Sequence, residues 1–567
     1  MPTIRLPLIG ANSQRNPDAY NNTSKDCRYV NCVVKTAPNP ITRKNEFFLE
    51  KRIGLEAVST VDGTNNGCAT LVSGGIRYST FQTASASRVF SGTTLIGTAD
   101  IAVGLLPLNV GLTQISEVSL AGTRFLFFSH SRQETNPAGT GIYYFDTTLT
   151  IGTTTFTGDL NSSTSITNIS SAANLRVGQR VTHANIPAGT RITVINGTTL
   201  TISAAATATA ATQTITQEHL SKIMSANMPT KTTGKVFAMN GRVFFLDTVN
   251  YRIYQTAFND PQTVNSQDYI SLDYMADLAV GIQQNGMTAY GFGQNSIEIF
   301  NYAGNASGSQ LTRAGVVDNG CPLISFSPNC VLNGVLYFVS FNGGIYRMSE
   351  SSPQKISTPA IDAILASAAS QSSSNSGVYI DGFYYDGRPF ISVVSATNLG
   401  ATPTVTSTFW YDIELNVWTE QKFTVSSTDR PVRLNSVGEL RQTGAILCAA
   451  LGKTYKLDFA SPVYQDDSST MTMTMQLGNS DLGTGKRKFF KRAWLVGDTQ
   501  SDGTVTLEYS DDDYASWVTA GTFDLTNLGI SINRLGSSRK RAWRLTDANN
   551  QAGRYQALDI EYEVGTS

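Results

Sequence analysis

The sequence predicts an all-β protein built around a β-propeller, and two observations carry this prediction. First, one pattern occurs three times between Lys235 and Met348: an apolar strand, a Gly turn, an apolar-aromatic strand, a short polar turn and a further strand. Apolar–polar alternation between Asn, Gly and Asp turns is typical of antiparallel strands. Second, the copies follow one another at about 45 residues, the length of a propeller blade.

The three copies are residues 236–246 with 252–256, 288–293 with 296–300, and 331–340 with 344–348. Strands similar to the last one of each copy occur at residues 75–78, 141–146, 408–412 and 453–458. A small sheet cannot bury both of its faces alone, but four-stranded sheets packed radially can. We therefore expect a β-propeller of six or seven blades, with six preferred. The alternative is a long β-sandwich whose hairpins are similar by coincidence.

The composition indicates a folded chain of more than one domain. It has 567 residues, of which 41% are hydrophobic and 15% charged, and its net charge is −1. A chain with few charges and many aromatic residues is not expected to be disordered. Near neutrality gives the whole chain no attraction for nucleic acid. No apolar run has the form of a signal peptide or reaches the length of a membrane span, so we expect no membrane-spanning segment and folding in a cytoplasm.

The six Cys and three His do not have the spacing of a metal site. They are Cys27, Cys32, Cys68, Cys321, Cys330, Cys448, His130, His183 and His219. We expect buried free thiols, no bound metal and no cofactor.

Changes in composition suggest four regions. Residues 1–60 are polar and weakly patterned, and we interpret them as an N-terminal arm packed on something, or else a loose end. Residues 61–152 and 218–462 form the propeller. Residues 153–217 are rich in Thr, Ser and Ala and nearly free of aromatics, and we interpret them as a small inserted β-module. Residues 463–567 have longer strands and are predicted to form a C-terminal β-sandwich.

One helix is expected after the three repeats, over residues 358–366. Thr358 can cap it, Pro359 lies in its first turn, and Ile361, Ile364 and Leu365 form an apolar stripe.

No motif in the sequence predicts catalysis. Residues 510–517 are close to an Asp-box hairpin, with Tyr514 where that motif has Gly, and such a box is structural even in enzymes. Nucleophile elbows, phosphate-binding loops and dinucleotide fingerprints are absent from the sequence. We therefore predict no catalytic residue and no enzyme activity.

Two basic runs in the last hundred residues are candidates for an interface. The alternative is that they are solvated strand ends. Tryptophans beside them favour an interface slightly, because aromatic residues and Arg are common anchors. With four residues of the N-terminal region, the interface candidates are Arg28, Tyr29, Phe47, Phe48, Lys486, Arg487, Lys488, Lys491, Arg492, Trp494, Arg539, Lys540, Arg541 and Trp543.

The order of several segments resembles one known family, the packaged-DNA stabilization or tail-nozzle (tail hub) proteins of short-tailed bacteriophages related to P22. The resemblance covers about 400 residues. It lies in the order of the segments along the chain more than in identical residues at matching positions. Ile53 stands where the family usually has Pro. The segments are residues 29–31, 50–55, 292–300, 315–320, 333–346, 356–365, 491–494 and 507–514.

The resemblance implies a structural protein of the virion tail, assembled in the host cytoplasm. The family forms a homohexameric ring below the portal and adaptor, which retains packaged DNA and conducts it on ejection. The implied partners are the adaptor, tail fibres or spikes, a needle or plug, and double-stranded DNA in passage.

Two other functions remain open from the sequence. A carbohydrate-active propeller, either a depolymerase or a lectin, would use Asp381, Asp386 and the region of Trp410 and Trp418. A DNA-binding clamp would use the two basic runs and bind DNA with a steep salt dependence.

Overall fold

The chain is described by a computed structural model, which covers most of the sequence. The described residues are 3–9, 27–38, 45–60, 64–70, 77–82, 86–91, 94–100, 113–130, 141–152, 154–229, 232–275, 277–320, 329–349, 351–370, 377–397, 404–425, 428–429, 432–435, 445–450 and 453–566. Strands dominate them, and α1 (Pro359–Ser370) is the one α-helix in these ranges. The all-β prediction and the predicted helix are confirmed.

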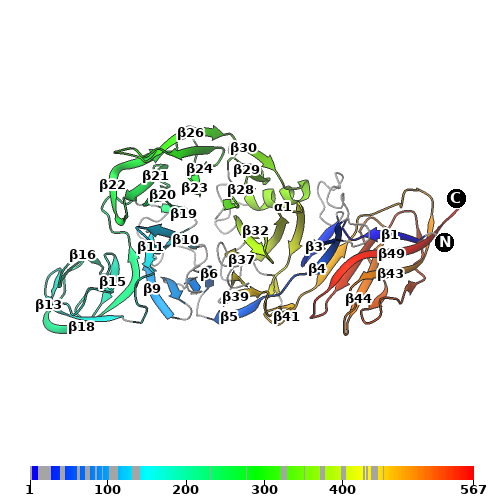
Figure 1. Ribbon diagram of the computed structural model, residues 1–567, viewed down its shortest axis with the longest axis horizontal. Helices are drawn as coiled ribbons and strands as arrows, with labels where there is room; N and C mark the ends of the chain where they lie inside the picture. Colours follow the sequence, from blue (N-terminus) through cyan, green and yellow to red (C-terminus); the bar gives the residue numbers. More distant parts are fainter. Residues whose placement is uncertain are drawn as a thin grey trace.

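Seven groups of four antiparallel strands follow one another in the described part of the chain, and Figure 1 shows them around a common centre. The first three groups are β6 (Thr64–Thr70), β7 (Arg77–Gln82), β8 (Ala86–Ser91) and β9 (Thr94–Asp100); β10 (Thr113–Leu120), β11 (Thr123–His130), β12 (Tyr143–Asp146) and β18 (Thr209–Lys222); and β19 (Thr232–Met239), β20 (Arg242–Asp247), β21 (Arg252–Ala257) and β22 (Asp260–Ser271).

The next two groups are β23 (Ala279–Asn285), β24 (Thr288–Gly293), β25 (Ile297–Tyr302) and β26 (Leu311–Val317); and β27 (Asn329–Leu332), β28 (Val335–Val339), β29 (Ile345–Ser349) and β30 (Ser352–Lys355). The last two are β31 (Gly377–Tyr385), β32 (Arg388–Thr397), β33 (Thr404–Asp412) and β34 (Val417–Gln421); and β37 (Arg433–Asn435), β38 (Ala445–Ala450), β39 (Lys453–Asp458) and β5 (Glu56–Thr60).

The first strands of the seven groups contact one another in order. Contacts join β6 to β10, β10 to β19, β19 to β23, β23 to β27, β27 to β31, β31 to β37, and β37 back to β6. Apolar side chains fill the space between neighbouring groups. Phe244 of β20, for example, shares one buried cluster with Ile282 of β23 and Phe300 of β25.

Local turn chemistry explains the hairpins that the sequence pattern predicted. Asn240 and Gly241 both have positive φ between β19 and β20, and Asn333 and Gly334 do the same between β27 and β28. Asn-Gly suits such two-residue turns because these residue types tolerate a positive φ. The pattern described three strands per unit, whereas each group also has a fourth strand.

A smaller β unit is attached to the second group. It contains β13 (Thr155–Asn161), β14 (Ser165–Thr167), β15 (Gln179–Thr182), β16 (Ile192–Asn196) and β17 (Thr199–Ile202). The long strand β18 pairs with β13 and β15 of this unit and with β12 of the second group. The unit has its own core, which includes Leu160, Ile192 and Ile215, and it lies at the left end of the molecule in Figure 1.

The opposite end of the molecule contains two sheets that share one hydrophobic core; we call it the C-terminal unit. The first sheet contains β1 (Thr3–Pro7), β3 (Cys32–Pro38), β4 (Asn45–Lys51), β43 (Lys488–Gly497), β46 (Ile532–Asn533), β47 (Ser537–Ser538) and β49 (Arg554–Val564). The second contains β2 (Arg28–Val30), β42 (Met473–Gln476), β48 (Ala542–Asp547), β44 (Thr504–Ser510) and β45 (Val518–Asp524). Two short hairpins lie between β34 and β42: β35 (Thr424–Val425) with β36 (Thr428–Asp429), and β40 (Gln465–Asp466) with β41 (Ser469–Thr470).

The N-terminal region is distributed over both large parts of the molecule. Strands β1 and β4 pair with β49, and β5 pairs with β39 in the seventh group. Strand β2 lies between β34 and β42, so one continuous sheet runs from the sixth group into the C-terminal unit. The described residues of the predicted N-terminal arm therefore pack on the chain's own sheets.

Candidate functional site

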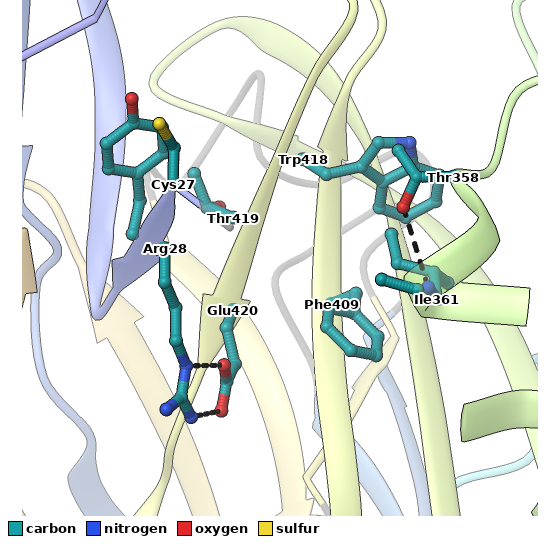
Figure 2. A pocket seen from close by; sticks show the side chains of 10 residues that line it. Cys27, Arg28, Thr358, Ile361, Phe409, Trp418, Thr419 and Glu420 are labelled. Atoms are coloured by element: carbon teal, nitrogen blue, oxygen red, sulfur yellow. Dashed lines mark hydrogen bonds and ion pairs between the residues drawn. The ribbon is translucent and has the colours of Figure 1, made fainter. Parts of the chain in front are cut away.

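A pocket of about 80 Å³ opens where the N-terminal region meets the sixth group. Strand β2 contributes Arg28 and Tyr29, which follow Cys27, and strands β33 and β34 contribute the opposite wall with the start of α1. Figure 2 shows Cys27 and Arg28 on one side of the strand that carries Glu420, with Phe409, Ile361 and Thr358 on the other side. The pocket thus lies on the continuous sheet that joins the two large parts of the molecule.

The polar groups around this pocket are engaged with the protein. Arg28 donates to both carboxylate oxygens of Glu420, at 2.5 and 2.6 Å, and this hydrogen bonding raises the pKa of Arg28. The indole Nε1 of Trp418 donates to the Ile356 carbonyl at 2.9 Å. Thr358 caps α1, with its hydroxyl accepting from the Ile361 amide at 3.5 Å.

The free surface of the pocket is mainly the apolar walls of Ile361, Phe409 and Trp418. Such a notch suits an apolar side chain, and it holds no arrangement of a nucleophile with a base.

A buried ion pair also joins the N-terminal region to the segment that follows the sixth group. Arg52 and Asp466 are both fully buried, and their two hydrogen bonds measure 2.9 and 2.7 Å. Arg52 also donates to the carbonyls of Ile53 and Lys422 and lies over the Phe423 ring at 4.2 Å. The connection between β4 and β5 is therefore tied to the connection between β34 and β42.

Sequence reasoning missed this pair. Arg52 lies within residues 50–55, one of the segments used for the family resemblance, but nothing there indicates a partner 414 residues away. A second buried cation, Lys51, donates to the carbonyl of Asn549 at 2.5 Å and lies 3.6 Å from the Asp547 carboxylate.

Among the four N-terminal interface candidates, Phe47 is the exposed one, at 39%. Tyr29 is buried, and its hydroxyl donates to the Leu8 carbonyl at 2.7 Å. Phe48 is half-buried beneath the Arg554 guanidinium, 4.6 Å from the ring centre, and Arg28 is held by Glu420.

Three of the C-terminal interface candidates are buried within the unit. Lys488 donates to the carbonyls of Thr484, Lys486 and Arg539, and burial lowers its pKa. Arg541 donates twice to Asp511, at 2.6 Å each, and lies against the ring of Trp543, which is 2% exposed. These side chains serve the fold of the chain itself.

The other seven are half-buried or exposed. Lys491 lies 3.2 Å from the carboxylate of Glu563, and Arg492 lies 3.8 Å from that of Glu561. Trp494 is half-buried opposite Asp559. The exposed residues Lys486, Arg487, Arg539 and Lys540 come together beside the paired strands β43 and β47.

The structure separates the residues considered for a carbohydrate-active site. Asp381 is on β31, and Asp386 lies in the following turn, where it pairs with Lys35. The four extended steps from Asp381 to Tyr385 already span about 13 Å of backbone, more than the separation of about 5–9.5 Å between glycosidase carboxyl groups. Trp410 is fully buried among aromatic side chains, and Trp418 donates to Ile356.

The Asp-box-like segment forms the turn between β44 and β45, as predicted. Asp512 accepts from the Ser516 amide at 3.0 Å and from the Ser510 hydroxyl at 2.8 Å. Hydrogen bonds from Ser516 and Ser510 lower the pKa of Asp512 to about 2. Tyr514, at the Gly position of the motif, has a φ of 71°, which explains why Gly is usual there.

Within the described ranges, no group of three or more His, Cys, Asp or Glu side chains is arranged to hold a metal ion. Cys32 and Cys330 are buried free thiols, and the side chains of Cys68, Cys321 and Cys448 lie outside the described residues. No helix in the described residues has the length and apolar character needed to span a membrane.

Comparison with known proteins gives one family match. Residues 144–390, less than half of the chain, match the family described as "Bacteriophage P22 Gp10, beta-propeller". No curated protein matches the chain.

Solved structures match over most of the chain at low identity. The computationally designed Ika8 protein is 8% identical, with a TM-score of 0.35, covering 71% of this chain and 98% of its own. The extracellular domain of a putative hybrid two-component system from B. thetaiotaomicron is 8% identical, with a TM-score of 0.37, covering 87% of this chain and 58% of its own. The structure of U3-55K is 6% identical, with a TM-score of 0.32, covering 71% of this chain and 98% of its own.

Proposed function

We propose, from the premise that residues 144–390 belong to the packaged-DNA stabilization family of P22-like bacteriophages, that this chain is a structural protein of the virion tail. In this proposal it is the tail nozzle or hub, a ring below the portal and adaptor that retains packaged DNA and conducts it on ejection. The family match is the observation that carries the proposal, and it agrees with the resemblance drawn from the sequence.

We infer a seven-bladed propeller with a C-terminal β-sandwich as the architecture behind this role. Seven consecutive four-stranded groups, with β37 contacting β6, support seven blades over six. The shared core of the two terminal sheets supports the sandwich. Strand β2 and the Arg52–Asp466 pair would keep the two parts in one orientation, as a ring subunit requires.

The ring is proposed to be a homohexamer, assembled in the host cytoplasm and located in the tail. Closed rings use a heterologous interface, in which two different surfaces of each subunit meet. The exposed candidates for such a surface are Phe47, Lys486, Arg487, Lys491, Arg492, Arg539 and Lys540. The proposed partners are the adaptor, tail fibres or spikes, and a needle or plug, while double-stranded DNA passes through.

We propose no enzyme activity for the chain. The structural family and the separation of Asp381 from Asp386 support this, and they disfavour the depolymerase and lectin alternative.

Light scattering on the purified chain, alone and with portal–adaptor complexes, tests the proposal. We expect a mass near six copies, either free or only on the adaptor. A chain that stays monomeric with portal–adaptor complexes and that releases reducing sugar from a host polysaccharide would overturn the proposal in favour of a depolymerase.

A further inference from the structure

Two basic segments that are about 50 residues apart in sequence meet at one end of the C-terminal unit. Lys486 and Arg487 directly precede β43, and Arg539 and Lys540 directly follow β47. Strands β43 and β47 pair antiparallel, with Lys488 opposite Ser538. This pairing brings the start of β43 beside the end of β47, so the four positively charged residues lie close together on the surface.

A buried lysine fixes the backbone of both segments. The ammonium of Lys488 donates to the Lys486 carbonyl at 2.9 Å and to the Arg539 carbonyl at 2.5 Å, so the two segments are joined through one nitrogen. Its third acceptor is the Thr484 carbonyl at 2.6 Å. A buried charge requires such partners, so the Lys488 side chain stays bonded to these carbonyls. These bonds hold the two backbone segments that carry the four exposed cations in a fixed arrangement.

These four cations differ from several other basic residues of the unit. Lys491, Arg492 and Arg544 each lie within 4 Å of a carboxylate, those of Glu563, Glu561 and Glu508. Across the described residues, no ion pair joins Lys486, Arg487, Arg539 or Lys540 to a carboxylate. Arg487 donates to the hydroxyl of Ser537 at 3.0 Å, which orients the guanidinium and leaves its charge uncompensated.

We propose that Lys486, Arg487, Arg539 and Lys540 form a binding surface for the phosphate backbone of double-stranded DNA. Four neighbouring like charges repel one another, and a dense row of anions relieves that repulsion. Duplex DNA offers about one negative charge per 1.7 Å of its axis, and Arg and Lys bind phosphate oxygens without reading sequence. The four side chains are exposed and lie at a strand end, which suits an extended polyanion.

An acidic protein is the competing partner, because Phe489 (45% exposed) and Val564 (44%) lie close by and would suit a protein contact. The pairing of β43 with β49 places these two residues near each other, since Lys488 is opposite Val564 and Phe489 is opposite Glu563. The DNA proposal predicts that the charges carry the affinity and that these apolar side chains add little. It stands whether or not the chain forms a tail ring.

The test measures binding of the full chain to a fluorescent 30-base-pair duplex at several salt concentrations. With four phosphate contacts, we expect log K to fall with log salt at a slope of about −3.6. Reversing the charges (K486E, R487E, R539E, K540E together) should weaken binding by at least about tenfold at low salt. The matched control K491Q/R492Q, which removes two basic residues that already have carboxylate partners, should retain affinity within about twofold.

Three results would overturn the proposal. One is the absence of salt-dependent duplex binding by the unaltered chain. Another is equal loss of binding in the control and in the charge-reversed variant, both checked for folding by circular dichroism. The third is tighter binding to polyglutamate than to DNA at equal charge concentration, with loss of that binding in F489S, which would assign the surface to an acidic protein.

Discussion

At the residue scale, the Arg52–Asp466 pair shows how one buried contact joins distant parts of the chain. Neither side chain reaches solvent, and Asp466 also accepts from the amides of Leu55 and Thr424. Burying two charges is costly, so such a pair is retained only with good geometry and further hydrogen bonds. Both conditions hold here, because Arg52 has three additional acceptors.

We predict that Arg52→Met destabilises the chain strongly. The substitution leaves the Asp466 carboxylate buried without its counter-charge, which costs about 3–5 kcal/mol. Thermal unfolding followed by circular dichroism measures the effect. The control is Arg5→Met, which removes an exposed pair with Asp559 and should cost about 1 kcal/mol or less. Similar unfolding temperatures for the two variants would contradict the structural role of Arg52.

Gly54 carries a second prediction at this scale. Its amide donates to the Val463 carbonyl at 2.6 Å, and a Cβ at this position would overlap the backbone of Gln465. Gly54→Ala should therefore cost about 1–3 kcal/mol or prevent soluble expression, because the neighbouring backbone has to move. Gly485→Ala is the control, since nothing lies within 4 Å of its added methyl group and its φ is outside the left-handed region. Equal unfolding temperatures for both variants would count against this close approach.

At the scale of elements, β18 combines two environments in one strand. Its first half belongs to the small β unit, and its second half pairs with β12. His219 lies in the second half and is 1% exposed, and neither of its ring nitrogens has a hydrogen-bond partner among the described residues. Burial lowers the pKa of His219. Ion pairs on neighbouring segments join Arg176 to Asp146 and Arg180 to Glu218.

This burial predicts a pH effect on stability. A histidine whose folded pKa is lowered resists protonation, so the unfolded chain takes up the proton first as the pH falls below about 6.5. The unfolding temperature should therefore drop between pH 7.5 and pH 5, and His219→Leu should drop less. Calorimetry of both proteins measures the difference, with His183→Leu, a half-buried histidine of the small unit, as the control. An identical pH dependence in the His219 variant would exclude this role.

The same scale shows what sequence patterns can predict. The hairpins β19–β20 and β27–β28 were predictable, because an Asn-Gly turn and alternating side chains act over a few residues. The pairing of β1 with β49 and of β5 with β39 was not, because no local pattern names a partner strand several hundred residues away. The interface candidates show the same limit: Lys488 and Arg487 are neighbours in a basic run, but one is buried and the other exposed.

At the scale of the whole molecule, the N-terminal region connects both large parts. Strands β1 to β4 join the sheets of the C-terminal unit, and β5 completes the seventh group. We predict that a chain lacking residues 1–60 loses structure in both parts, because each then has an unpaired strand edge and exposed apolar residues. Limited proteolysis, with fragments identified by mass spectrometry, measures the protease protection of each part separately. The prediction is contradicted if either part of the shortened chain is as well protected as it is in the full chain.

The pairing of β5 with β39 also has a consequence for synthesis of the chain. Residues 56–60 leave the ribosome early, but their partner at residues 453–458 is made nearly 400 residues later. At about 5–20 residues per second, the early strand waits on the order of 20–80 s before it can pair. Strand β1 waits longer still, until residues 554–564 of β49 are made. Strand β2 waits as well, for β34 and β42. Nascent chains therefore carry β1, β2 and β5 unpaired while several hundred residues are made, and synthesis speed and chaperone binding should affect the yield of this protein more than its final stability suggests.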